Sequence, residues 1–245
     1  LTIVNCTFIN NTAANNGGAI AGVGSGNLTI SGSLFNGNTV DEVNLLEDHI
    51  VDALLDVAAS GENVVEREGL SVRHPARFVL VGSGNPEEGE LRPQLQDRFG
   101  LSVDVRTPKD VSTRVEIIRQ REDFDHDRAA FRKKWARKES ALRRKIQHAR
   151  ASLDDIDTPA ELLETAAHLC LSLGTDGLRG ELTLVRSARA LAALQGKPVA
   201  TLSHLKTVAT SVLRHRLRRD PLDESSADSR VERAVSELFG HDNNS

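Results

Sequence analysis

Short apolar stretches separated by Asn- and Gly-rich turns fill the first 39 residues. Residues 1–3 (Leu-Thr-Ile) return 27 positions later at residues 28–30, and Phe8 returns at the same interval as Phe35. A period in the twenties with strand-prone runs is typical of a parallel β-helix, whose turns Asn and Gly tolerate well. We expect strands at 1–4, 19–23 and 28–30. Because solenoid coils bury a core only by stacking, we expect these 39 residues to be poorly packed.

The hydrophobic pattern changes after residue 40. Apolar residues recur at helical spacing over residues 45–60 and predict an amphipathic helix that Gly61 ends. Residues 62–74 alternate and predict a β-hairpin. The continuous apolar run at 78–81 predicts a buried parallel strand, with polar residues at its carboxyl end, where α/β folds place ligand contacts.

From residue 107 onward the pattern is helical. The expected helices cover residues 110–122, 128–152, 159–173, 181–194, 202–217 and 229–239. The pattern as a whole predicts three parts: a β-helix-like segment at 1–39, an α/β segment at 40–106 and an all-α domain at 107–245.

Composition adds a sharp boundary to this division. No Asp, Glu, Lys or Arg precedes Asp41, so all 31 basic and 35 acidic residues lie after residue 40. The net charge of -4 argues against a dedicated nucleic-acid-binding protein. Cys6 and Cys170 indicate neither a disulfide framework nor a metal site, and no apolar run is long enough to span a membrane. Because the chain has no Met and begins at Leu1, we expect a fragment, a processed chain or a spliced one.

A basic cluster on the helix expected at 128–152 has two interpretations. Its members are Arg132, Lys133, Lys134, Arg137, Lys138, Arg143, Arg144 and Lys145. Nucleic-acid binding is one reading, but the acidic residues close by favour a solvated helix face. We interpret Trp135 as a local packing anchor rather than a base-stacking platform.

Residues 1–39 resemble the repeats of polymorphic outer-membrane proteins. The resemblance rests on Phe-Ile-Asn-Asn at 8–11, Gly-Gly-Ala-Ile at 17–20 and Phe-Asn-Gly-Asn at 35–38. In that family such repeats form right-handed β-helices on secreted or surface-exposed proteins, so this segment alone would imply an extracellular or outer-membrane location. A flexible Asn/Gly-rich leader is the alternative.

The remaining residues, from about 40 to 245, resemble the ATPase subunit I of magnesium chelatase, an AAA+ family. Five separated stretches in family order carry the resemblance. They are Asp-Glu-Val-Asn-Leu-Leu-Glu-Asp-His at 41–49, Gly-Ser-Gly-Asn-Pro-Glu-Glu-Gly at 82–89, Leu-Arg-Pro-Gln-Leu-Gln-Asp-Arg-Phe-Gly at 91–100, Gly-Thr-Asp-Gly-Leu-Arg-Gly-Glu-Leu at 174–182, and His-Arg-Leu-Arg-Arg-Asp-Pro-Leu-Asp at 215–223. The implied fold is an AAA+ core from the Walker B strand onward, followed by an all-α lid.

The resemblance implies a role for five residues. Asp41 would contact the Mg²⁺ bound to ATP, Glu42 would polarise the attacking water and Asn85 would position it. Arg98 would be the arginine finger that reaches the nucleotide site of a neighbouring subunit, and Arg179 would be the sensor 2 arginine. Without the family motifs, we would interpret Arg98 as a surface ion-pair partner and Arg179 as a helix-capping cation.

One required motif does not occur in the chain. A phosphate-binding loop has the pattern Gly-x-x-x-x-Gly-Lys-Ser/Thr, because its amides and lysine hold the phosphates. The pair Gly196-Lys197 is followed by Pro198, and repeat sequence stands where the strand before Asp41 is expected. We therefore expect an N-terminally truncated AAA+ core that neither binds nor hydrolyses ATP by itself.

The family resemblance also implies cofactors, partners and a location. These are ATP and Mg²⁺, a homo-oligomeric ring, the D and H subunits of magnesium chelatase, and the cytoplasm or plastid stroma. The implied activity is ATP-driven insertion of Mg²⁺ into protoporphyrin IX in chlorophyll or bacteriochlorophyll biosynthesis. Two alternatives stay open: a surface β-helix protein without enzymatic activity, and a chain that joins two unrelated genes.

Overall fold

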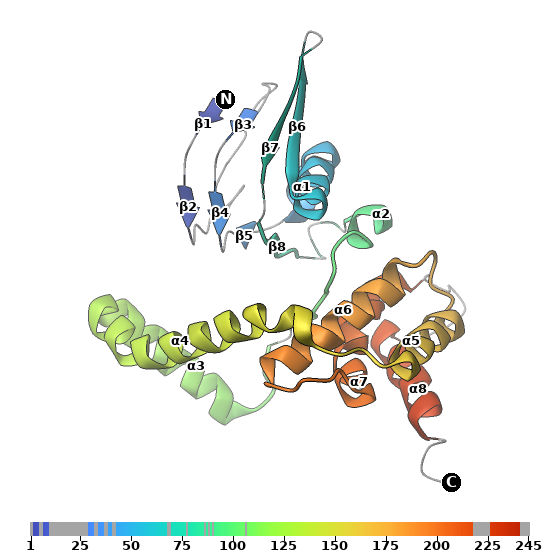
Figure 1. Ribbon diagram of the computed structural model, residues 1–245. Coiled ribbons are helices and arrows are strands. Elements are labelled where there is room, and N and C mark those ends of the chain that lie inside the picture. The colour runs from blue at the N-terminus through green and yellow to red at the C-terminus, as the bar shows by residue number, and fades with distance from the viewer. Residues whose placement is uncertain are drawn as a thin grey trace. The chain divides into compact units, whose positions relative to one another are not determined.

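The computed structural model divides into two compact units, Leu1–Phe99 and Gly100–Ser245 (Figure 1). The first unit holds the strands and the second is helical. The boundaries expected at 39/40 and 106/107 stay predictions. The residues that the structure describes are 2–4, 7–9, 29–31, 34–36, 39–40, 43–67, 70–76, 78–85, 87, 89, 91–105, 107–217 and 226–240.

Four short strands in the N-terminal segment pair at the interval of the sequence repeat. They are β1 (Thr2–Val4), β2 (Thr7–Ile9), β3 (Thr29–Ser31) and β4 (Leu34–Asn36). The β1–β3 and β2–β4 pairs are parallel, and Ile3 lies opposite Ile30 as Phe8 lies opposite Phe35. The pairing follows the repeat, as a parallel β-helix requires. The strand expected at 19–23 and the side-chain packing of this segment lie outside the described residues.

A third parallel pair joins β5 (Thr39–Val40) to β8 (Val81–Gly82), with Thr39 opposite Val81. The prediction of a buried parallel strand over residues 78–81 is confirmed in its parallel pairing and wrong in its burial and extent. The strand is only two residues long, and the side chains of Val79 and Val81 are 71% and 48% exposed. Among the described residues β5 is the one strand that pairs with β8, whereas a buried parallel strand has neighbours on both sides and covered faces.

The predicted amphipathic helix is α1 (Asp48–Ser60), which follows the short η1 turn (Val43–Leu45). Gly61 ends it in the left-handed conformation (φ 71°), with its N–H donating to the Val57 carbonyl, so this part of the prediction is confirmed. Val51 and Leu55 are buried on the inner face and form a small core with Leu95 of α2 (Pro93–Gln96).

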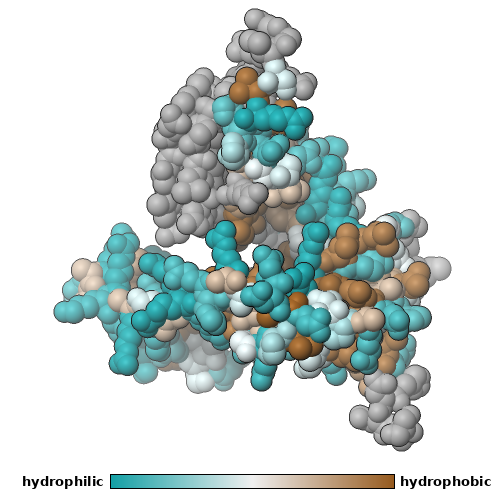
Figure 2. Space-filling model, viewed as in Figure 1, coloured by the Kyte–Doolittle hydropathy of each residue, from teal (hydrophilic) through white to brown (hydrophobic). Residues whose placement is uncertain are grey.

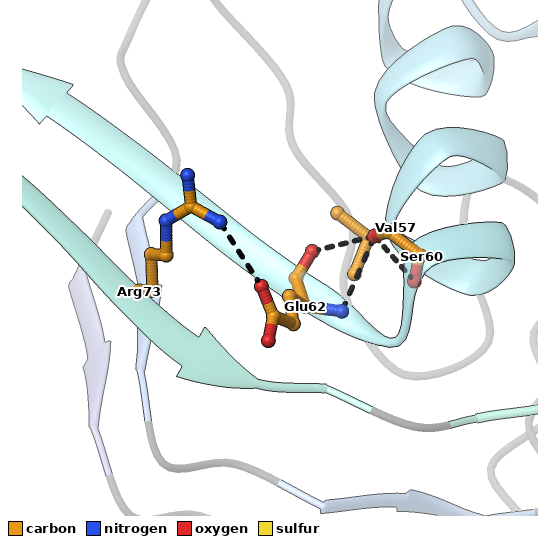
Figure 3. Close-up of polar contacts among 4 residues, drawn as sticks. All are labelled: Val57, Ser60, Glu62 and Arg73. Carbon is orange, nitrogen blue, oxygen red and sulfur yellow. Dashed lines mark hydrogen bonds and ion pairs between the residues drawn. The ribbon is translucent and has the colours of Figure 1, made fainter.

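The predicted hairpin is confirmed as β6 (Glu62–Arg67) and β7 (Leu70–Pro75). The register places Arg67 opposite Leu70, and the two residues between them lie outside the described part of the chain. Figure 3 shows how its base is held: the Ser60 hydroxyl donates to the Glu62 carbonyl at 2.9 Å, and Arg73 Nη1 lies 3.5 Å from Glu62 Oε2. The hairpin is thereby fixed to the end of α1.

All six helices expected after residue 107 are present within a few residues of their predicted bounds. They are α3 (Val111–His126), α4 (Arg128–Ala151), α5 (Ala160–Leu173), α6 (Arg179–Leu194), α7 (Leu202–Leu213) and α8 (Ala227–Gly240), with short turns η3 (Leu153–Asp155) and η4 (Arg214–Arg216). The core lies among α5, α6, α7 and α8, where Leu169, Leu184 and Leu205 are fully buried. No described helix has both the length and the apolar character needed to cross a membrane.

The helices α3 and α4 form a hairpin with a largely hydrophilic surface (Figure 2). All eight residues of the predicted basic cluster are exposed, as expected for a solvated face. The Phe131 ring packs 5.6 Å from Phe124 and 6.0 Å from Trp135, and Lys138 Nζ lies 4.4 Å from the Trp135 ring centre. Trp135 is therefore a local packing residue, as predicted.

The start of α3 should depend on pH through Asp110. This carboxylate accepts hydrogen bonds from the Ser112 hydroxyl (2.6 Å) and from the hydroxyl and N–H of Thr113, which lower its pKa from 3.8 to about 2. Because the pKa is lowered in the folded state, the cap stabilises α3 above pH 4 and is lost as the pH falls through about 2. The ¹³Cα chemical shifts of Ser112 and Thr113, which are raised in a helix, should decrease as the pH is lowered from 4 to 2.

The matched control for this titration is Asp110→Asn, which keeps a capping oxygen but does not titrate. Its shifts at Ser112 and Thr113 should stay constant between pH 4 and 2. Unchanged shifts in the wild-type chain over the same range would contradict the assigned cap.

Candidate functional site

The β5–β8 pair places two motif stretches side by side at one edge of the small sheet. Because the strands are parallel, the chain leaves both at the same end. Just beyond, the Val43 N–H donates to the Ser83 carbonyl at 2.7 Å, and Asn44 Nδ2 donates to the Asn85 carbonyl at 3.2 Å. The predicted catalytic residues Asp41 and Glu42 lie outside the described residues, so their roles stay predictions.

Close backbone approach at this edge depends on two glycines. A Cβ atom on Gly84 would lie 2.9 Å from Asn44 Oδ1, and one on Gly82 would lie 3.1 Å from a methyl carbon of Val43. A larger residue at either position would force the facing side chain of Asn44 or Val43 to shift. Asn44 belongs to the motif at 41–49, but no role was assigned to it from the sequence.

Asn85 follows β8 at this edge, where the sequence analysis placed it. Its side chain is exposed, and its Oδ1 accepts a hydrogen bond from the Glu87 N–H at 3.1 Å. This bond holds the amide in one orientation, with the Nδ2 donor directed elsewhere. The water-positioning role of Asn85 stays a prediction.

Arg98 is bound to two carboxylates of α1. Its Nη1 lies 2.6 Å from Asp52 Oδ1 and 2.7 Å from Asp56 Oδ1, and its side chain is 33% exposed. One turn earlier on the same helix, Asp48 Oδ2 lies 2.6 Å from Arg92 Nε. The three aspartates follow each other at four-residue intervals, a signal of a shared helix face that the sequence analysis missed. The structure thus gives Arg98 the ion pairs of the alternative reading, and the finger role stays a prediction.

Arg179 is the first residue of α6 and is exposed. The turn before it contains Gly177 in the left-handed conformation (φ 67°), and the next residue, Gly180, is buried. A Cβ atom on Gly180 would lie 3.3 Å from Cys170 Sγ, so the beginning of α6 packs closely on α5. The motif at 174–182 is therefore a tight helix entrance that fixes where Arg179 starts the helix. Its sensor role stays a prediction.

Cys170 is a buried small residue of the helical core. Burial, with the nearby charge of Glu181, raises the pKa of its thiol from 9.0 to about 11. The thiol is therefore neutral near pH 7 and is a poor nucleophile in the folded chain.

The last motif stretch begins in η4 and anchors the start of the helical unit. Arg216 Nη1 donates to the Gly100 carbonyl at 3.3 Å. Arg214 lies 3.0 Å from an oxygen of Asp228 on α8 and 3.7 Å from one of Asp104. Arg216 of this stretch and the preceding Arg214 therefore hold residues 100–104 against the helices, while residues 218–223 lie outside the described part.

Two family profiles match separate parts of the chain. The AAA lid domain matches residues 163–235, within the helical unit, and the Chlamydia polymorphic membrane protein repeat matches residues 5–23. Both matches agree with the resemblances drawn from the motifs.

The chain is also similar to curated magnesium-chelatase subunits. The 38 kDa subunits of Acidiphilium rubrum and Cereibacter sphaeroides are each 66% identical over 200 residues, which is 82% of this chain and 58% and 60% of those proteins. The subunit ChlI of Anabaena variabilis is 49% identical over 201 residues, and the match covers 60% of its length. The chain thus spans about three fifths of the length of these relatives.

Two solved structures are similar as well. A structure of the complex between subunits BchI and BchD of magnesium chelatase has 56% sequence identity, with 84% of this chain and 60% of that one covered and a TM-score of 0.31. A candidate ATPase of Cytophaga hutchinsonii has 17% identity and a TM-score of 0.60 over 80% of this chain and 64% of that one, which supports the fold. Over the 200 residues that match at 66% identity, this chain belongs to the magnesium-chelatase 38 kDa subunit family, with part of an AAA+ core followed by its helical lid.

Proposed function

We propose that this chain acts as an ATPase-type subunit in a magnesium chelatase, whose ATP hydrolysis drives insertion of Mg²⁺ into protoporphyrin IX. The parallel β5–β8 pair carries the proposal, because it sets the segment after the predicted Walker B strand against the loop that contains Asn85. The 66% identity to curated 38 kDa subunits supports the same conclusion.

The residues of this chain fit only part of an ATP and Mg²⁺ site. Asn85 stands at a strand end with a fixed amide, as a water-positioning residue would. However, the 245 residues contain no phosphate-binding loop, so nothing supplies the amides and lysine that would hold the phosphates. Asp41 and Glu42 are therefore not part of a complete nucleotide-binding site within these 245 residues, and we derive no hydrolysis step within this chain.

What this chain can supply is an arginine for a neighbouring subunit's site. A guanidinium is planar, permanently charged and able to donate several hydrogen bonds to phosphate oxygens. Supplied in trans, such a finger stabilises transition-state charge and contributes roughly 10³ to 10⁵ in rate. Arg98 would have this role, and Arg179 would respond to the nucleotide state.

The proposal extends to partners and location. The subunit would assemble in a homo-oligomeric ring and work with the D and H subunits, in the cytoplasm or plastid stroma. The 56% sequence identity to a chain of the BchI–BchD complex supports the D partnership. A surface β-helix function is not favoured for the whole chain, because the polymorphic membrane protein repeat matches residues 5–23 alone.

The proposal predicts that this chain restores ATP hydrolysis to a subunit without its own finger. The Acidiphilium rubrum 38 kDa subunit would carry alanine at the arginine matching Arg98, and phosphate release from Mg²⁺-ATP would be measured with increasing amounts of this chain. We expect no release by this chain alone, and at least about a tenfold rise in the mixture, with saturation. Co-assembly by size-exclusion chromatography without any rise in rate would refute the proposal.

A further inference from the structure

We propose that Asp52 and Asp56 are positioning residues for Arg98, which hold its guanidinium in one direction for use by a neighbouring subunit. The proposal rests on the finger role proposed for Arg98 and adds the residues that fix the orientation of its side chain. Neither aspartate belongs to the site residues expected from the family resemblance.

The geometry places two carboxylate oxygens beside one nitrogen, with Asp56 accepting a hydrogen bond from it and Asp52 in an ion pair with it. Asp52 and Asp56 are four residues apart on α1, so both carboxylates project from the same face. Their Oδ1 atoms lie 2.6 and 2.7 Å from Arg98 Nη1. A single carboxylate would let the guanidinium pivot, whereas two on the same nitrogen restrict its direction.

The same contacts leave the other two guanidinium nitrogens of Arg98, Nε and Nη2, available to a ligand. Both ion pairs use Nη1, and within the described residues no carboxylate pairs with Nε or Nη2 of Arg98. These atoms carry three of the five N–H donors of arginine, which suit bidentate contact with phosphate oxygens. The two carboxylates thus hold the guanidinium in place without occupying the N–H donors on Nε and Nη2.

Packing beneath the ion pairs makes the arrangement rigid. Val51 and Leu55 of α1 are buried against Leu95 of α2. Arg98 follows α2 directly, with its N–H donating to the Leu95 carbonyl at 3.1 Å. The backbone that carries Arg98 is therefore fixed on the helix that carries its two carboxylates.

An isolated surface ion pair contributes little to stability, but Arg98 pairs with two carboxylates, so the test below separates a positioning role from a stabilising one. A hollow of about 350 Å³ lies beside the ion pairs and keeps Arg98 accessible. Its lining residues are Asp48, His49, Asp52, Arg92, Gln94, Leu95 and Arg98. An accessible guanidinium held by two carboxylates is what a residue aimed at another molecule's phosphates requires.

The first test uses the mixture of this chain with the finger-deficient relative. In Asp52→Asn/Asp56→Asn both charges are lost while the side-chain shapes are kept. We expect the saturating rate to fall about tenfold to a hundredfold, because small misplacements of catalytic groups cost that much. The chain concentration for half-maximal rate should change less than about twofold, since association is not the step affected.

The matched control is Asp48→Asn, which removes a charge from the same helix face but pairs with Arg92 rather than Arg98. Its saturating rate should stay within about twofold of wild type. Equal rates for the wild-type chain and the double variant would overturn the positioning proposal and leave the finger role standing.

A second measurement decides the case in which the wild-type chain restores nothing. Side-chain ¹⁵N NMR of the full chain reports rotation of the Arg98 guanidinium. We expect separate Nη resonances in the wild-type chain and one averaged resonance in the double variant. Averaged resonances in the wild-type chain would overturn the positioning proposal whatever the mixture does.

Discussion

Arg98→Ala should reduce the restored ATP hydrolysis to the background of the finger-deficient relative, a loss of up to about a thousandfold. The reason is the missing guanidinium at the neighbouring site, which no other group replaces. Arg98→Lys should lose nearly as much, because an ammonium is a point charge without the bidentate fork. The measurement is the saturating rate of phosphate release in the mixture.

Arg73→Ala is the control for this loss. Arg73 is another arginine of the first unit, and it is exposed and paired with the carboxylate of Glu62. It has no part in the proposed site. Its mixture should keep the wild-type rate. A wild-type rate with Arg98→Ala would show that this chain does not supply the finger through Arg98.

Leu205→Ala should destabilise the helical unit by about 2 to 5 kcal/mol, because it leaves a cavity in the core. Leu205 of α7 is fully buried among the helices. Urea unfolding of the full chain, followed by far-UV circular dichroism, measures the change through the midpoint of the helical transition.

The control makes the same substitution at an exposed site. Leu171 lies on α5 with 75% of its surface exposed, so Leu171→Ala should change the stability by less than about 0.5 kcal/mol. Similar midpoints for the two variants would contradict the assigned core.

Elements defined by local sequence were predicted well. The hairpin follows from the alternation of residues 62–74, and Gly61 marks the end of α1 because glycine adopts the left-handed conformation of that position without strain. The helices after residue 107 follow from their periodicity. Burial of residues 78–81 was predicted wrongly, because it depends on strands and helices elsewhere in the chain and not on the apolar run itself.

The family motifs named candidate site residues but not their contacts. They pointed to Asn85, Arg98 and Arg179, whose roles stay predictions. The partners of Arg98 were not predicted, since Asp52 and Asp56 precede it by more than forty residues and meet it only when α2 packs on α1. The bond from Asn44 to the Asn85 carbonyl likewise depends on the β5–β8 pairing.

The register of the N-terminal strands accounts for the boundary in charge. Strands that pair at the repeat interval place each residue opposite its own counterpart, as with Ile3 and Ile30. A charged residue kept in such a repeat would face a like charge at about 4.8 Å, a repulsion of about 1 kcal/mol even in water. Neutral pairs avoid that repulsion, and three of the paired positions are identical: Thr2 with Thr29, Ile3 with Ile30 and Phe8 with Phe35. The absence of ionic side chains before Asp41 therefore suits strands that pair at the interval of their own repeat.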